Sequence, residues 1–300
     1  MSASTESEGY TMQRCASCGT AGGDEIKLKN CTACYLVKYC SVKCQKDHRP
    51  KHKKECKKRA AELEDEILFK QPESNNFGDC PICCLPLPLD PSKYCLTSCC
   101  CKRICYGCDN ANKKREDERR LEQKCAFCRT AFPETKEENI EQLMKRIEAN
   151  DPVALCQMGA EKLNEGDYKS AFEYATRAAA MGDSEAHYQL SLLYYTGQGI
   201  GKDEKRELHH LKEAAIAGHP LARHNLGSME VENGRFDRAA KHFIIAAKLG
   251  DDRSLNVAKA LYKNEDVSKE DFAAALRGHK AAIDAMKSPQ REEAENIRGA

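Results

Sequence analysis

The residues in this chain whose types and spacing suit chemistry are its cysteines, and their pattern predicts metal binding. The chain has 19 cysteines, and all but Cys156 lie within residues 15–128. Five Cys-x2-Cys pairs occur, and each can aim two sulfurs at one ion from a tight turn. Disulfides need an oxidising compartment, and nothing in the sequence directs the chain to one. A redox motif uses a single Cys-x2-Cys pair, so the presence of five pairs favours structural zinc instead. The pairs are Cys15/Cys18, Cys31/Cys34, Cys80/Cys83, Cys105/Cys108 and Cys125/Cys128.

The first eight candidate ligands lie within residues 15–56, and the last four form two i, i+4 pairs. That spacing places each pair on one face of a helix. Ser41 predicts the cap of one short helix, and Pro50 predicts the first turn of a second. Eight ligands predict two tetrahedral sites, although the spacing alone does not say which residues share an ion. The eight are Cys15, Cys18, Cys31, Cys34, Cys40, Cys44, His52 and Cys56.

The complete spacing resembles the MYND zinc finger, down to Tyr39-Cys40-Ser41 and Cys44-Gln45. The resemblance implies a shallow groove beside the second helix that binds short proline-containing peptides, with Gln45 in that groove. Many family members have Trp four residues later, where this chain has Arg49, and this departure concerns peptide binding rather than the fold. The resemblance also implies interleaved sites, with Cys15, Cys18, Cys40 and Cys44 on one ion and Cys31, Cys34, His52 and Cys56 on the other.

A second cysteine-rich region, at 80–132, predicts two more zinc sites. Three of its four ligand pairs are the Cys-x2-Cys pairs, and the fourth is open because five thiols compete for it: Cys84, Cys95, Cys99, Cys100 and Cys101. We expect Cys99 with Cys101, and Cys99 with Cys100 is the alternative. The expected ligands are therefore Cys80, Cys83, Cys99, Cys101, Cys105, Cys108, Cys125 and Cys128.

This second region resembles a RING finger of an all-cysteine type, most closely at Cys80-Pro81-Ile82-Cys83 and Cys125-Ala126-Phe127-Cys128-Arg129. RING domains of ubiquitin ligases contribute no catalytic nucleophile; they hold a ubiquitin-charged conjugating enzyme in a reactive alignment. The resemblance implies that Ile82 contacts that enzyme and that Arg129 bridges to ubiquitin. The chain departs from the common pattern because these ligands include no His, the chain has no Trp, and Ala126 replaces the usual Pro.

The elements beyond residue 134 follow an internal repeat. Three alanine-rich segments end at Gly182, Gly218 and Gly250, which lie 36 and 32 residues apart. Each unit is predicted to be helix, turn, helix, with these glycines at left-handed helix ends. The units resemble Sel-one-like repeats, relatives of tetratricopeptide repeats, most clearly over 186–215. That resemblance implies a right-handed solenoid with a concave binding face.

A fourth, weaker unit begins near Leu255, and Ser268 with Asp271 predicts a capping box for its second helix. The fold class is therefore mainly α, with two small zinc-stabilised modules followed by an α-helical solenoid of about four helix-turn-helix repeats. The expected segments are a disordered tail (1–13), a MYND-type finger (14–58), a helical connector (59–76), a RING-like finger (77–133), a helix (134–150), the repeats (151–287) and a second disordered tail (288–300).

Composition narrows the classes of function. Charged residues make up 32% of the chain, mean hydropathy is -0.70, and no stretch of 18 apolar residues predicts a membrane span. The first 14 residues lack the apolar core of a signal peptide, so we expect an intracellular protein, cytoplasmic or nuclear. No Asn-His-Ser-Cys-like motif of a SET methyltransferase occurs. Five histidines of the repeats are expected at the surface rather than in a metal site: His209, His210, His219, His224 and His242.

The charge balance argues against bulk attraction to nucleic acid. The formal net charge is +1, and about 15 thiolates on four Zn2+ ions would change it by about -7. The basic run 49–59 is expected to be the solvated face of a ligand-bearing helix, and nucleic-acid binding is the alternative. We expect a zinc-binding adaptor, with about two Zn2+ ions in each finger, whose repeats and fingers recruit different proteins. The alternative is a RING-type ubiquitin ligase that uses the repeats for substrate choice.

Overall fold

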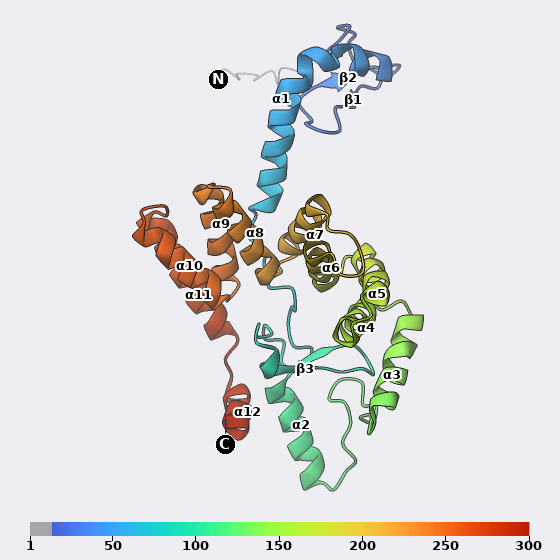
Figure 1. Cartoon of the computed structure of the whole chain (residues 1–300), viewed down its shortest axis with the longest axis vertical. Helices are drawn as coiled ribbons and strands as arrows, with labels where there is room; N and C mark the ends of the chain where they lie inside the picture. Colours follow the sequence, from blue (N-terminus) through green and yellow to red (C-terminus); the bar gives the residue numbers. More distant parts are fainter. Residues whose placement is uncertain (1–13, 300) are drawn as a thin grey trace, which may run out of the picture. The chain divides into compact units, whose positions relative to one another are not determined.

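The computed structural model describes residues 14–299, so the predicted disordered tail at 1–13 lies outside the described residues. The chain divides into two compact units, Met1–Leu68 and Phe69–Ala300. Most of the described chain is helical, as predicted, and the two short sheets are confined to the cysteine-rich regions. Figure 1 shows the order of these elements along the chain.

The first unit is a short hairpin followed by one long helix. Strands β1 (Lys29–Asn30) and β2 (Lys38–Tyr39) pair antiparallel, and α1 covers Val42–Leu68. Ser41 caps α1 as predicted, because its Oγ accepts the backbone N–H of Cys44 at 3.2 Å. The separate second helix and the connector helix predicted from Pro50 and residue 59 are instead parts of α1. Pro50 removes only one helix hydrogen bond. It lies between Cys44 and His52, which belong to two different ligand groups, so the two groups together can hold the helix on both sides of the proline.

The second cysteine-rich region contains a hairpin and a helix. A short 3-10 turn, η1 (Pro91–Lys93), leads into β3 (Tyr94–Leu96), which pairs antiparallel with β4 (Arg103–Cys105). Helix α2 (Tyr106–Glu118) starts directly after Cys105. The core of this cysteine-rich region consists largely of cysteine, with Leu87 and Ile104 fully buried. A core this small leaves much of the stability of the region to bound metal.

Helix α3 (Lys136–Glu148) precedes the repeats, and Thr135 caps it by accepting the backbone N–H of Glu138. The repeats then form four helix pairs, as predicted. The first helix of each pair begins at a side-chain cap, at Asp151, Asp183, His219 or Asp251. The pairs are α4 (Pro152–Glu165) with α5 (Tyr168–Ala180), α6 (Ser184–Thr196) with α7 (Glu204–Ile216), α8 (Pro220–Glu232) with α9 (Phe236–Lys248), and α10 (Asp252–Lys263) with α11 (Lys269–Ala285).

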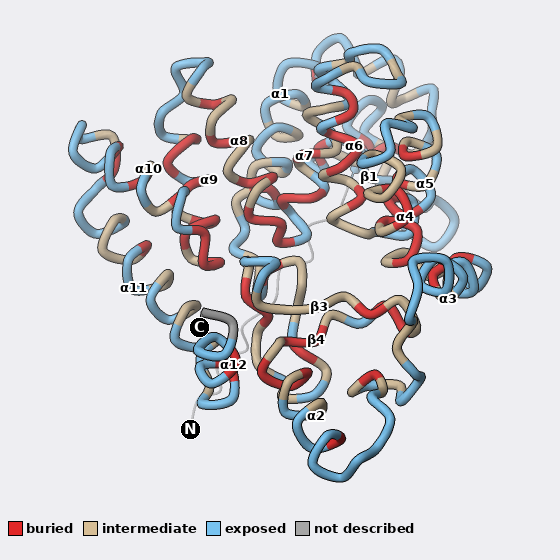
Figure 2. Tube along the Cα trace, turned by 60° about the horizontal axis from the view of Figure 1, so that its bottom comes forward, coloured by how far each residue is buried: buried red, intermediate tan, exposed pale blue. Residues whose placement is uncertain are grey.

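The residues that distinguish the repeats take the predicted conformations. Gly182, Gly218 and Gly250 all have positive φ, at 84°, 83° and 99°. Ser268 caps α11 as predicted, with the backbone N–H of Asp271 3.0 Å from Ser268 Oγ, but the Asp271 carboxylate accepts from the Ser268 hydroxyl rather than from its backbone N–H. Buried residues follow the facing sides of the repeat helices, where alanines allow close packing (Figure 2).

The end of the chain differs from the prediction of a disordered tail. Residues Pro289–Gly299 form helix α12, which packs against α2 of the second cysteine-rich region (Figure 1). Proline suits the first position of a helix, and Ser288 accepts the backbone N–H of Arg291. Arg291 is only 6% exposed and Ala294 only 2%. Burial of these two side chains against the second cysteine-rich region orders the segment.

Candidate metal centres and interaction surfaces

Sixteen side chains gather into four groups of four, and the donor atoms of each group lie within 4.8 Å of one another. Two groups lie in the first unit and two in the second cysteine-rich region, which agrees with about two zinc ions per module. The groups are Cys15, Cys18, Cys40 and Cys44; Cys31, Cys34, His52 and Cys56; Cys80, Cys83, Cys105 and Cys108; and Cys99, Cys100, Cys125 and Cys128.

The ligand pairs alternate between sites along the chain in both modules. The first and third pairs form one group, and the second and fourth pairs form the other. In the first module this is the pairing that the MYND resemblance implies. In the second module the same order appears, because the β3–β4 hairpin carries Cys99 and Cys100 to one site and returns Cys105 to the other. Each module is therefore interleaved.

The donor distances fit zinc. Tetrahedral zinc with Zn–S bonds of about 2.3 Å requires sulfurs separated by about 3.8 Å. The Sγ atoms of Cys18 and Cys40 are 3.5 Å apart, and those of Cys83 and Cys105 are 3.8 Å apart. His52 Nε2 lies 3.1 Å from the sulfur of Cys34, so this nitrogen is the donor atom. All 19 cysteines, each within the described residues, carry free thiols.

Hydrogen bonds favour the thiolate form in at least three of the groups. Burial alone would raise the pKa of Cys15, but backbone N–H groups including that of Cys18 outweigh burial and lower this pKa to about 6. The same balance lowers the pKa of Cys31 to about 6. A hydrogen bond from the Cys105 side chain lowers the pKa of Cys80 to about 4. The same hydrogen bond raises the pKa of Cys105. A divalent cation relieves the repulsion that opposes the second thiolate, so these electrostatics fit bound zinc.

A common turn presents one Cys-x2-Cys pair in each of the four groups. In each turn the residue after the second cysteine has positive φ and donates its backbone N–H to the carbonyl of the first cysteine. The four such residues are Gly19, Tyr35, Cys84 and Arg129, with N–O distances of 2.8 to 3.0 Å.

The expectation that Cys101 is a ligand differs from the structure, which places Cys100 in the group instead. A fifth turn of the same kind spans 97–101, with Thr97 in the position of the first cysteine and the N–H of Cys101 bonded to its carbonyl at 2.8 Å. Cys101 has φ of 52° and turns away from the site. It packs instead with Leu143 and Ile147. The Cys-x2-Cys pattern does not reveal this turn in the sequence, because Thr97 stands where the other four turns have cysteine.

The other two competing thiols, Cys84 and Cys95, also lie outside the four groups. Cys84 follows a turn and is exposed, and the sulfur of Cys95 contacts the carbonyl of Ile104 at 3.6 Å.

The two residues expected to contact a conjugating enzyme and ubiquitin differ in their surroundings. Ile82 is 42% exposed, so it is accessible. Arg129 forms an ion pair of 2.6 Å with Glu116, whose side chain is fully buried, and it donates to Asn112 at 2.9 Å. Burial opposes ionisation of Glu116, but the N–H of Lys124 and the guanidinium outweigh it and lower the pKa of Glu116. Through these two contacts Arg129 links α2 to the turn that carries Cys125 and Cys128.

A groove of about 450 Å3 lies along α1 beside the second ligand group of the first unit. Gln45, the predicted groove residue, lines it together with Arg49. Val42 and Ala60 contribute apolar surface, and three lysines also line the groove: Lys46, Lys53 and Lys57. The groove therefore lies where the MYND resemblance implies a peptide site.

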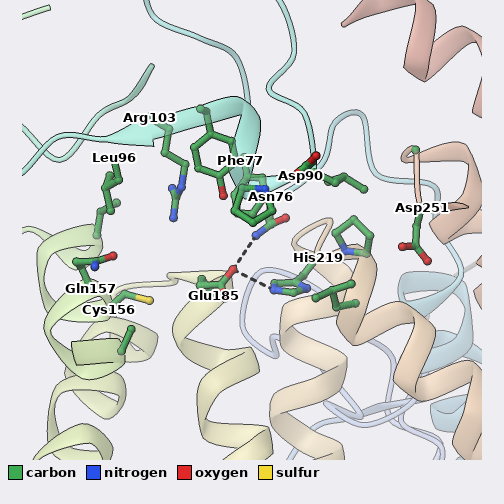
Figure 3. Close-up of a pocket in the computed structure, with 18 of the residues that line it drawn as sticks. Asn76, Phe77, Asp90, Leu96, Arg103, Cys156, Gln157, Glu185, His219 and Asp251 are labelled. Atoms are coloured by element: carbon green, nitrogen blue, oxygen red, sulfur yellow. Dashed lines mark hydrogen bonds and ion pairs between the residues drawn. The ribbon is translucent and has the colours of Figure 1, made fainter. Parts of the chain in front are cut away.

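A cavity of about 890 Å3 lies between the second cysteine-rich region and the first turns of α6, α8 and α10 (Figure 3). Glu185 joins the two sides, because its carboxylate accepts from Asn76 at 3.4 Å and from His219 Nε2 at 3.1 Å. The other ring nitrogen of His219 accepts the N–H of Ala222 and caps α8. Arg103 lies over the ring of Phe77 at 4.9 Å and faces this cavity.

The prediction of surface histidines is therefore wrong at two positions. His219 is 2% exposed and His242 is fully buried. His219 is buried because it serves as a helix cap, and His242 because its ring packs against Phe69 at 4.8 Å. Cys156 is 3% exposed, and burial raises its pKa well above the ordinary value, which disfavours the reactive thiolate.

Comparisons with known proteins bear on the first finger and on the repeats. Residues 15–56 match the MYND finger family, and residues 152–183, 184–219 and 220–251 each match the Sel1 repeat. Over 51 residues the chain is 41% identical to the SET domain and MYND-type zinc finger protein 6 of Schizosaccharomyces pombe. That match covers 17% of this chain and 11% of the relative, so the chain spans a small part of that protein.

Two solved structures are similar to about half of the chain. A Sel1 repeat protein from Oxalobacter formigenes is 28% identical with a TM-score of 0.45, covering 52% of this chain and 67% of that one. A protective antigen of uropathogenic Escherichia coli strains displaying an SLR fold is 20% identical with a TM-score of 0.41, covering 55% and 37%. Across the described residues, no helix combines the length and apolar character that crossing a bilayer requires. The chain thus contains a MYND finger, followed by a second cysteine-rich module with two further zinc-competent groups and by three Sel1 repeats.

Proposed function

We propose that this protein is an adaptor whose zinc-stabilised fingers and Sel1 repeats recruit different proteins. The observation that supports the proposal most directly is the groove along α1, which contains Gln45 and lies beside a zinc-competent group. A site formed on a rigid helix next to a metal cluster is preorganised for a short peptide. In this proposal the protein works inside the cell, where reducing conditions keep its thiols available for zinc.

The repeats provide the second recruiting surface. Their helix pairs leave the cavity beside Arg103 and Glu185 open to solvent along its rim, and repeat arrays commonly bind proteins through such extended faces. The domain limits we propose for the two surfaces are 14–58 and 151–287.

The test uses the full zinc-loaded chain and a panel of fluorescent proline-containing peptides. At least one peptide should bind, and Gln45→Ala should weaken it at least fivefold. Lys51→Ala, an exposed change on the same helix outside the groove, should leave affinity unchanged. Failure of every peptide to bind a correctly loaded chain would contradict the groove part of the proposal.

A ubiquitin ligase is the second candidate, and the interleaved order of the 80–128 ligands favours it together with the exposure of Ile82. Against it, Arg129 already pairs with a buried carboxylate within the chain. The chain with activating enzyme, a panel of conjugating enzymes and ubiquitin should form polyubiquitin if this candidate holds. Ile82→Ala should then abolish the product, whereas Leu121→Ala, at another exposed apolar residue, should not. Absence of product with every conjugating enzyme leaves the adaptor proposal.

A further inference from the structure

The groove along α1 is lined by four cations and by no acidic side chain. All four are exposed: Lys46, Arg49, Lys53 and Lys57. Within residues 14–299, no ion pair joins any of them to a carboxylate, whereas Lys58 and Arg59 on the same helix pair with Glu62. The positive charge of the groove is therefore not neutralised by carboxylates, whereas the cations of the neighbouring turn of α1 are.

Their spacing places these cations on one stripe of α1. Arg49, Lys53 and Lys57 are successive i, i+4 neighbours, and like charges at that spacing repel one another. The adjacent zinc-competent group contributes three thiolates, which with one Zn2+ leave a charge of about -1. That charge does not balance four cations, so the groove retains a net positive potential.

From these observations we propose that the groove binds an acidic peptide segment, in which carboxylates flank a proline. This inference rests on the proposed peptide function of the groove and names the class of partner. Arg49 stands where many MYND fingers have an aromatic residue, and its planar guanidinium binds a carboxylate through two parallel hydrogen bonds. Lys53 and Lys57 extend the same stripe toward further carboxylates, and Val42 offers the apolar contact for the proline ring.

The groove suits a peptide better than a nucleic acid. Single-stranded nucleic acids bind through aromatic faces on which bases stack, in addition to basic residues. The two aromatic rings that line this groove belong to Tyr39 and His52, which are 3% and 5% exposed. Neither ring offers a free face, so phosphate contacts alone would hold an oligonucleotide.

The test measures binding of the full zinc-loaded chain to two labelled peptides of equal length by fluorescence anisotropy. One carries Glu on both sides of the proline, and the other carries Gln at the same positions. The Glu peptide should bind at least tenfold more tightly, and its affinity should fall as salt rises. The double substitution Lys53→Gln with Lys57→Gln should weaken the Glu peptide roughly tenfold, since each exposed pair contributes a few-fold.

The matched control is Lys51→Gln with Lys54→Gln, which removes the same charge from exposed positions of α1 outside the groove. It should change affinity less than twofold, and both variants should keep the same zinc content and helicity. If the control weakens binding as much as the groove variant, binding depends on the total charge of the helix rather than on the groove, and the proposal is wrong.

The remaining outcomes separate this inference from the proposed function. Equal affinity for both peptides, weakened by Gln45→Ala, would overturn the acidic preference and retain the peptide groove. Failure of both peptides would overturn the inference, and the peptide groove itself would fall only if every peptide of the panel also failed to bind. Tight binding of a single-stranded oligonucleotide that needs Lys53 and Lys57, with no binding of the Glu peptide, would overturn the inference in favour of a nucleic-acid site.

Discussion

Nη2 of Arg291 lies 3.5 Å from the sulfur of Cys83, so a side chain near the end of the chain contacts a zinc-competent cysteine 208 positions earlier. The same guanidinium donates to the carbonyls of Leu85 and Pro86, at 3.1 and 2.7 Å. Partners outside the ligand set orient ligands and stabilise a site. Helix α12 therefore acts as a clamp on the first zinc loop of the second finger.

Removing this clamp should loosen the second finger. Arg291→Ala removes the guanidinium donor from the part-buried carbonyls of Leu85, Pro86 and Met286, and a typical intramolecular hydrogen bond contributes about 1 kcal/mol. We expect a lower melting temperature and faster zinc transfer to a chromogenic chelator from one of the four sites. Lys287→Ala, at an exposed residue just before α12 begins, is the control and should behave as the unmodified chain. Unchanged zinc release in the Arg291 variant would show that the clamp is not structural.

Gly107 allows α12 to approach α2 closely. A Cβ at this position would lie 2.9 Å from the backbone of Gln290 and Arg291. In a free helix, Ala in place of Gly stabilises by about 1 kcal/mol, so the sign of the effect is diagnostic. We expect Gly107→Ala to lower the free energy of unfolding and to increase hydrogen exchange in 289–299. Gly201→Ala, which meets open space, should be neutral, and stabilisation by Gly107→Ala would refute the packing.

The assignment of Cys100 over Cys101 has a direct test in metal content. Cys100→Ser should reduce zinc from about four ions per chain to about three, because it removes one of four donors. Cys101→Ser should keep all four ions and lower stability through its buried position, which is 6% exposed. Elemental analysis of protein from a reducing host measures both. Loss of an ion in the Cys101 variant alone would restore the sequence-based assignment.

His242 should make the repeats sensitive to acid. Burial first, and then the positive charges of Arg223, Arg238 and Lys212, lower its pKa from 6.5 to about 3. The unfolded chain takes up a proton as pH falls below 6.5 and the folded chain does not, so stability is full above 6.5 and falls toward pH 3. Between pH 7 and pH 5 this loss amounts to about 2 kcal/mol.

The measurement compares the pH dependence of unfolding in the unmodified chain and in His242→Leu. Zinc loss in acid affects both proteins equally, so the difference between their slopes reports His242 alone. His209→Leu, at a histidine whose side chain is 62% exposed, is the control and should retain the slope of the unmodified chain. Parallel curves for the unmodified chain and His242→Leu would contradict the prediction.

Local spacing was sufficient to predict much of this protein. Residues close in sequence can place two donor atoms together without help from the rest of the fold, because the few bonds between them limit where the donors point. This holds for the five Cys-x2-Cys pairs and for the i, i+4 pair His52/Cys56. The repeat glycines are equally local, since a left-handed helix end needs glycine at that residue. These features predicted the number of metal groups, the four helix pairs and the order of the modules.

Only the tertiary structure decided which neighbouring thiol turns toward a site and what covers it. Cys100 and Cys101 are adjacent and chemically identical, and the packing of Cys101 against Leu143 and Ile147 selects between them. The docking of α12, the burial of His242 and the joining of Glu185 to Asn76 and His219 all link segments far apart in sequence. Such contacts depend on the free energy of packing distant surfaces together, which no local spacing records.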